Sequence, residues 1–452
     1  MLAQPFAFKS LAFLITKMVG NISESVPYLD KKFAYADFYT RFLHPNLPCL
    51  FTQDHTSAWP VRSEWDENGL INIDIILKPF SCQEICVANC QELNFGTHPM
   101  IKMSAEDYLS YWKEGAKEKI LYLKDCHYFR NRDFNDFYRL PVYFSSDWLN
   151  EFSDFRTDCD DDFRFVYIGP KGTWTPLHAD VYCSFSWSAN IIGLKRWWIF
   201  PPGEEKKLTG PNGGSLPADI SDRKFAKPGC ETSDFPQCYI FDQRPGEMFF
   251  VPSGWYHQVM NLTDCVSINN NWLNACNVDL VWRHLQSQLQ EVKRSCSDVQ
   301  STPGWDEACQ AWEGWNYLEF FLLVKYILLS RWLRKTWQEI RDLLPKAPVV
   351  SQDSDALVPL RILDEQVDNL LSSTAKNDPS FVERLLENPQ KDDTHWLKLF
   401  VEVENVSRAV REHDLSQAIR TIYSMLRDSD LQSLGMHTRG PAAWLWKILI
   451  DN

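Results

Sequence analysis

Residues 169–180 have the sequence GPKGTWTPLHAD, which contains the only His-x-Asp motif of the chain, at His178 and Asp180. The motif opens a stretch of alternating polar and apolar residues, and such alternation predicts a β-strand. Residues two apart in a strand project to the same face, so these two side chains should point together into the protein interior. Tyr182 and Ser184 are then expected to follow on that face.

A third candidate ligand lies 79 residues further along, where His257 begins the strand-like run HQVMNL. Two imidazoles and one carboxylate on one side of a metal leave the opposite positions open, as in non-haem Fe(II) oxygenases. A single histidine in a β-protein is, however, more often a hydrogen-bonded core or surface residue, and an aspartate beside it can serve as a turn acceptor. The His-x-Asp pair alone therefore leaves both interpretations open.

The sequence around the motif predicts an all-β core. Between Lys119 and Trp272, short aromatic and β-branched runs alternate with turns rich in Gly, Pro, Asn and Asp, which is typical of a barrel or a double sheet. The main runs are KILYLKD, RFVYIG, YCSFSWSANIIG, RWWIFPP, EMFFVPSG, HQVMNL and CVSINNNW. After Asn277 the pattern becomes helical, with one apolar stripe formed by Val278, Trp282, Leu285, Leu289 and Val292.

The N-terminal flank is predicted to mix helices and strands. Residues 30–43 predict a helix that is followed by a strand in the PCLF segment, and residues 68–90 alternate enough to predict strands. Residues 104–116 predict a helix with Ser104 as its N-cap. The expected organisation is a flexible N-terminus over 1–25, an α/β flank over 26–138, a β core over 139–276, a helical extension over 277–344, a linker over 345–359 and a C-terminal helical region over 360–452.

Composition restricts the class of protein. The 452 residues are 44% apolar and 23% charged, which is ordinary globular usage, and the net charge of −14 argues against binding to nucleic acid through its phosphates. The apolar stretch 318–333 is interrupted by charged residues and falls short of the roughly 20 apolar residues needed to span a bilayer. We therefore expect no nucleic-acid partner and no membrane insertion.

Cysteine usage predicts a reducing compartment. The 13 cysteines are an odd number without any C-x-x-C pair, and no nuclear signal is evident, so we expect a cytoplasmic protein without a zinc ribbon. The first 17 residues are interpreted either as a weak presequence or as an upstream start before Met18.

Three segments, taken in order, resemble the JmjC (jumonji C) family of 2-oxoglutarate oxygenases: GPKGTWTPLHAD at 169–180, GLKRWWIFPP at 193–202 and PGEMFFVPSGWYHQVMNL at 245–262. The resemblance implies a mainly β core, a double-stranded β-helix or cupin-like jelly roll, with flanking N-terminal helices and a C-terminal α-helical region. The segments LYLKDCH, LPVYFSSDWLNEF and SINNNW also resemble a lysyl hydroxylase branch of this family, whose substrate is the translation termination release factor.

The resemblance also implies roles for eight residues. It makes His178, Asp180 and His257 the iron ligands, and it pairs Lys195 with the far carboxylate of 2-oxoglutarate. A buried dianion requires a cation and hydroxyl donors, because unpaired buried charge is costly. The remaining cosubstrate contacts implied by the resemblance are Tyr122, Thr175, Asn261 and Asn269. Relatives with the same spacing have an asparagine at the position of Ser188, so Ser188 and the nearby Asn190 receive no role.

The expected activity is Fe(II)- and 2-oxoglutarate-dependent hydroxylation of a protein lysyl side chain at C4, with dioxygen consumed and 2-oxoglutarate decarboxylated. The first alternative is a histone N-methyl-lysine demethylase, which the lack of zinc-reader motifs and basic segments disfavours. The second alternative is a non-enzymatic cupin-like scaffold, which the intact ligand positions and Lys195 disfavour. The oligomeric state is left open.

Overall fold

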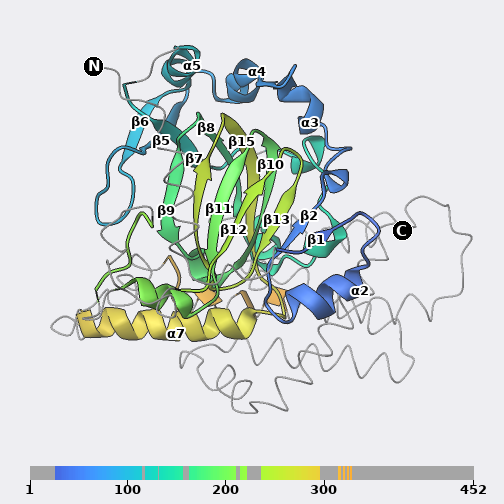
Figure 1. Cartoon of the computed structure of the whole chain (residues 1–452), viewed down its shortest axis with the longest axis vertical. Helices are drawn as coiled ribbons and strands as arrows, with labels where there is room; N and C mark the ends of the chain where they lie inside the picture. Colours follow the sequence, from blue (N-terminus) through green and yellow to red (C-terminus); the bar gives the residue numbers. More distant parts are fainter. Residues whose placement is uncertain are drawn as a thin grey trace, which may run out of the picture. The chain divides into compact units, whose positions relative to one another are not determined.

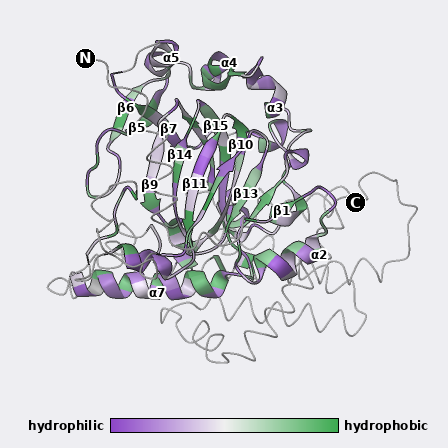
Figure 2. Ribbon diagram, in the orientation of Figure 1, coloured by the Kyte–Doolittle hydropathy of each residue, from purple (hydrophilic) through white to green (hydrophobic). Residues whose placement is uncertain are grey.

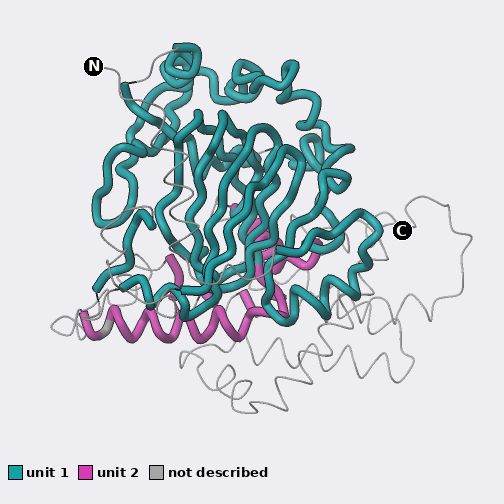
Figure 3. Tube along the Cα trace, in the orientation of Figure 1, with its two compact units in different colours: residues 1–144, 163–272 teal, residues 145–162, 273–452 magenta. Residues whose placement is uncertain are grey.

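The computed structural model describes residues 26–114, 118–130, 132–155, 162–209, 214–220 and 236–295, with short pieces at 314–316, 319–320, 323–324 and 326–327. The protein divides into two compact units, one formed by residues 1–144 and 163–272 and the other by residues 145–162 and 273–452 (Figure 3). The predicted flexible N-terminus, linker and C-terminal helical region lie outside the described residues, as does most of the helix expected after residue 315.

A large sheet of nine strands dominates the first unit (Figure 1). All of its pairings are antiparallel except that of β1 with β2, which is parallel. In spatial order the strands are β1 (Tyr28–Leu29), β2 (Cys49–Phe51), β13 (Met248–Val251), β10 (Phe185–Ile192), β15 (Cys265–Trp272), β8 (Arg164–Gly169), β7 (Leu121–Cys126), β5 (Glu84–Asn89) and β6 (Met100–Ser104).

A second sheet of four antiparallel strands packs against the large one. Its order is β12 (Tyr239–Gln243), β11 (Lys195–Phe200), β14 (Tyr256–Asn261) and β9 (Trp174–His178). Trp197 of the small sheet and Phe249 of the large sheet belong to one buried cluster, with ring centroids 4.9 Å apart. Two sheets enclosing a shared core confirm the predicted cupin-like jelly roll.

The central strand β10 is buried on both faces, and the two faces differ in chemistry. On the outer face, Trp187 stacks on Phe144 with centroids 5.7 Å apart, and Phe185 lies 5.3 Å from Phe250. On the inner face, the same strand has Ser186, Ser188 and Asn190. The outer face therefore supplies the apolar burial, while the inner face places polar groups inside the barrel.

Short helices cover the first unit, and one of them corrects the sequence prediction for residues 68–90. Asn72 accepts a hydrogen bond from Ile75 N at 3.3 Å and caps α4 (Ile73–Leu77), so this part of the segment is helical rather than extended. Ser104 caps α5 (Ala105–Lys113) by accepting from Asp107 N, as predicted. The first unit also contains the α-helices α2 (Tyr35–Phe38), which a π-helical turn (Tyr39–Leu43) continues, and α3 (Val61–Glu64). Its short hairpin is formed by β3 (Asp66–Glu67) and β4 (Leu70–Ile71).

The second unit contains α6 (Trp148–Phe155) and α7 (Val278–Ser295). Hydrophobic and hydrophilic residues alternate along α7 (Figure 2), as its predicted apolar stripe requires. Its buried residues are Val278, Val281, Leu285, Leu289 and Val292, while the half-buried Trp282 contacts Phe320 with tilted rings whose centroids lie 5.1 Å apart. Among the residues that the structure describes, no helix has the length and apolar character needed to cross a bilayer.

Gln243 joins the two sheets through three hydrogen bonds. Its fully buried amide nitrogen donates to Ser188 O at 2.7 Å and to Glu247 O at 2.9 Å, while its oxygen accepts from Trp197 Nε1 at 2.9 Å. We expect Gln243→Leu to lower the free energy of unfolding by about 2–4 kcal/mol, because three buried polar groups lose their partner. Urea unfolding followed by tryptophan fluorescence measures the change. The exposed Gln91→Leu is the matched control, and equal losses in both variants would contradict the bridging role.

Candidate active site

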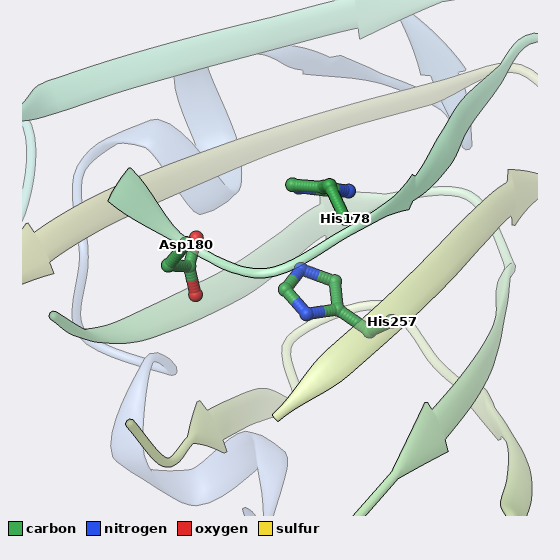
Figure 4. Close-up of side chains that lie close together, drawn as sticks. All are labelled: His178, Asp180 and His257. Carbon is green, nitrogen blue, oxygen red and sulfur yellow. The ribbon is translucent and has the colours of Figure 1, made fainter. Parts of the chain in front are cut away.

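Two histidines face each other across the edge of the small sheet. β9 pairs with β14 so that His178 lies opposite His257, with ring centroids 4.4 Å apart (Figure 4). The Nδ1 atom of His178 lies 2.7 Å from Pro176 O, and that of His257 lies 3.0 Å from Trp255 O. A carbonyl oxygen can only accept, so both Nδ1 atoms carry the proton and both Nε2 atoms keep a lone pair for a metal.

Asp180 reaches the histidines from beyond the end of β9. The predicted continuous strand is wrong here, because β9 ends at His178 and a 3-10 turn (Val181–Cys183) follows, with Tyr182 in the left-handed region at φ 57°. Tyr182 therefore does not share a strand face with His178. Asp180 itself keeps extended backbone angles. One potential ligand atom from each of His178, Asp180 and His257 lies within 4.8 Å of the other two, close enough for one metal ion.

Two polar side chains hold the Asp180 carboxylate in place. Ser186 Oγ donates to Asp180 Oδ2 at 2.8 Å, and Asn271 Nδ2 donates to Asp180 Oδ1 at 3.1 Å. Asn271 Nδ2 also lies 3.1 Å from Ser184 Oγ, so the network extends behind the carboxylate. Such outer hydrogen bonds orient metal ligands. Neither donor was predicted from the sequence, although Asn271 follows the predicted Asn269 at the two-residue spacing of a strand face.

Lys195 is a buried cation without a carboxylate partner among the residues that the structure describes. Its side chain is 2% exposed, and its Nζ donates to Tyr122 OH at 3.4 Å and lies 6.0 Å from the Tyr167 ring centroid. Burial lowers the pKa of this ammonium to about 8. Lys195 is opposite Asn261 on β14, four residues along the strand from His257. The site therefore combines a metal-binding triad with a separate cationic group.

One cavity joins these groups. Its lining includes seven of the eight predicted residues, and the full set is Tyr122, Tyr167, Thr175, His178, Asp180, Ser186, Trp187, Ser188, Lys195, Trp197, His257, Val259, Asn269 and Asn271. The eighth predicted residue, Asn261, is not part of the lining, and its Nδ2 donates to Thr173 Oγ1 at 2.8 Å. Ser188, which was left without a role, does line the cavity, whereas Asn190 Nδ2 donates to Gly193 O.

Unsatisfied polar atoms in the cavity indicate the chemistry of its ligand. Thr175 Oγ1, Ser188 Oγ and Asn269 Oδ1 are buried and have no hydrogen-bond partner within the described residues. Each such atom costs about 1–3 kcal/mol unless a ligand or water satisfies it. Hydroxyl groups beside the ammonium of Lys195 match a carboxylate, and the nearby triad matches a divalent metal. The residues present therefore fit an iron ion together with a small dicarboxylate.

Comparison with protein families places the protein in a known class. Residues 165–272 match the JmjC domain, described as a hydroxylase. The mouse 2-oxoglutarate and iron-dependent oxygenase JMJD4 is 43% identical over 320 residues, which span 67% of this chain and 74% of the mouse protein. The human protein of the same name is 42% identical, over 70% of this chain and 79% of its own length.

The fold and the site thus define a JmjC oxygenase that uses iron and 2-oxoglutarate, with dioxygen as its second cosubstrate. The protein belongs to the family of 2-oxoglutarate and iron-dependent oxygenases that contains JMJD4. A relative from Arabidopsis thaliana has a different name, arginine-specific demethylase JMJ20, and is 37% identical over 66% of this chain and 69% of its own length.

Gly169 makes room for the Tyr122 ring. A Cβ at this position would lie 2.5 Å from Tyr122 Cδ2 and 2.4 Å from Thr173 Oγ1. We expect Gly169→Ala to displace Tyr122 from Lys195 and to raise the KM for 2-oxoglutarate about tenfold, because one hydroxyl donor is lost. Gly214→Ala, where a Cβ meets nothing within 4 Å, is the control. Initial rates of 2-oxoglutarate decarboxylation give both KM values, and equal values would contradict this role of Gly169.

The lowered pKa of Lys195 makes cosubstrate binding dependent on pH. Below about pH 8 the ammonium is already charged, whereas above it binding of the dianion must take up a proton. The Kd for 2-oxoglutarate should therefore rise above pH 8 by up to tenfold per pH unit. Anaerobic calorimetric titration between pH 7 and 9.5 measures this rise. Lys195→Arg keeps its charge over this range and should give a flat profile, so a matching rise in that variant would assign the effect to another group.

Proposed function

We propose that this oxygenase hydroxylates a lysyl side chain of the translation termination release factor, with His178, Asp180 and His257 as the iron ligands. The observation that carries the oxygenase chemistry is the convergence of the three ligand atoms, within 4.8 Å, on a cavity that also contains Lys195. The resemblance of the flanking segments to lysyl hydroxylases supports the choice of substrate. Net charge of −14 is compatible with a basic protein segment as partner.

In this proposal the protein's own residues bind and orient. Lys195 and the hydroxyl groups of Tyr122 and Thr175 hold the far carboxylate of 2-oxoglutarate. Asn269 lines the same cavity. The Nδ1 hydrogen bonds of the two histidines keep their Nε2 lone pairs directed at the metal. Iron with 2-oxoglutarate and dioxygen supplies the oxidant that inserts one oxygen atom into a C–H bond and leaves succinate and carbon dioxide.

Two apolar side chains form part of the cavity wall. Trp197 and Val259 line the cavity from neighbouring strands, at positions that pair in the sheet. Trp197 also packs against Phe249 in the core, which fixes the wall of the site. Apolar groups in the wall lower the local dielectric constant and so strengthen the interaction between Lys195 and a carboxylate.

Demethylation of an N-methylated side chain is the second candidate. The name of the Arabidopsis relative, arginine-specific demethylase JMJ20, favours it. Both reactions oxidise a C–H bond of a protein residue at the same kind of site, and they differ in the carbon held near the metal. We also propose a cytoplasmic location and a protein substrate, on the cysteine usage and the family resemblance.

The proposed reaction is tested by mapping added oxygen. Purified release factor is incubated with iron, 2-oxoglutarate and either wild type or His178→Ala, and its peptides are analysed by mass spectrometry. We expect one oxygen on a lysine with wild type and none with the variant, since loss of one imidazole removes a metal ligand. The thermal midpoint of the variant shows that it is folded. Formaldehyde from methyl-arginine or methyl-lysine peptides, without oxygen on the release factor, would instead favour the demethylase.

A further inference from the structure

The large sheet lines one side of the active-site cavity with residues of β15 and β8. Asn269, which lines the cavity, is opposite Phe165 in the register of β15 and β8, so both side chains project to the same face. Tyr167, two residues further along β8, lines the cavity directly. Both residues are half-buried. On this side Tyr167 lines the cavity, and Phe165 is the next residue of β8 on the same strand face.

A carboxylate lies beside Tyr167 because β7 is irregular. The pairing of β7 with β8 shifts register between Leu123 and Cys126, and inside this bulge Asp125 adopts a left-handed backbone with φ 53°. Bulges of this kind redirect side chains near active sites. Asp125 Oδ1 accepts a hydrogen bond of 2.5 Å from Tyr167 OH, and the Asp125 side chain is 48% exposed.

Electrostatics at Tyr167 and Asp125 favours a cation. Burial raises the pKa of Tyr167 well above its usual range, and the negative charge of Asp125 raises it further. The phenol therefore stays protonated and keeps its hydrogen bond to Asp125. In the free enzyme Lys124 Nζ lies 3.2 Å from Asp125 Oδ2. A partly exposed pair of this kind contributes little free energy, so an incoming cation can displace Lys124.

We propose that Asp125, together with the rings of Tyr167 and Phe165, forms a subsite for the cationic head group of the substrate side chain, a lysyl ammonium. The inference rests on the proposed lysyl hydroxylase function. A carboxylate supplies charge-assisted hydrogen bonds, and aromatic faces attract an ammonium through their π-electrons. A side chain oxidised at an internal carbon must extend its ammonium beyond the metal. Tyr167 lines the cavity, and its hydroxyl group connects the cavity to the partly exposed Asp125.

Steady-state kinetics with the full-length release factor tests the subsite. Two variants are expected to change the KM for the release factor in opposite directions. Asp125→Asn keeps the acceptor for Tyr167 and removes the charge, so we expect the KM for release factor to rise about ten- to hundredfold with a smaller change in kcat. Lys124→Ala frees the carboxylate and should lower that KM. Asp54→Asn, an exposed residue of the N-terminal flank, is the control and should keep the wild-type KM.

A peptide competition separates a binding role of Asp125 from a structural one. A peptide that contains the hydroxylated lysine is compared with its Nε-acetylated form as an inhibitor of release-factor hydroxylation. Wild type should prefer the charged peptide, and Asp125→Asn should lose most of that preference. If wild type is active and Asp125→Asn keeps both the wild-type KM for the release factor and the preference for the charged peptide, the subsite is overturned. The proposed function would not be affected by that result. Wild type that adds no oxygen to the release factor would overturn the proposed function and the subsite with it.

Discussion

The buried ammonium of Lys195 is the constraint on which the rest of the site depends. It is 2% exposed, and among the described residues its one hydrogen-bond acceptor is Tyr122 OH at 3.4 Å, with the Tyr167 ring 6.0 Å away. A cation in such surroundings is costly unless an anion joins it, so the fold holds an incomplete charge pair that a dicarboxylate completes. The buried hydroxyl groups of Thr175 and Ser188 also have no hydrogen-bond partner among the described residues. A bound carboxylate can accept a hydrogen bond from each of them.

The two faces of the central strands differ in role. One face stabilises the fold through apolar packing, which offsets the free-energy cost of the polar groups that the other face places in the site. Trp187 of β10 stacks on Phe144 and adds apolar burial, while Ser186 and Asn271 hold Asp180 through hydrogen bonds. The inner face is therefore built for binding at the expense of stability. A ligand that binds only the folded state stabilises that state by mass action. Bound cosubstrate should therefore raise the free energy of unfolding. Catalytic geometry and stability are thus coupled through the same residues.

Much of the fold can be predicted because its determinants are local. The complete site cannot, because it depends on contacts between residues that are far apart in the sequence. Strand runs such as Arg164–Gly169 and the Ser104 helix cap follow from neighbouring residues alone. The turn after His178 did not, because alternation of polar and apolar residues does not reveal the left-handed backbone at Tyr182. The role of Asn271 depends on its hydrogen bond to Asp180, 91 residues away in sequence, and no local pattern encodes that contact.

A crystal structure of the protein with Mn(II) and N-oxalylglycine, an unreactive analogue of 2-oxoglutarate, tests the central claim most directly. We predict that the metal is bound by His178 Nε2, Asp180 and His257 Nε2, and that the far carboxylate lies within hydrogen-bond distance of Lys195 Nζ. A metal held by other residues, or an analogue whose carboxylate does not contact Lys195, would contradict the account.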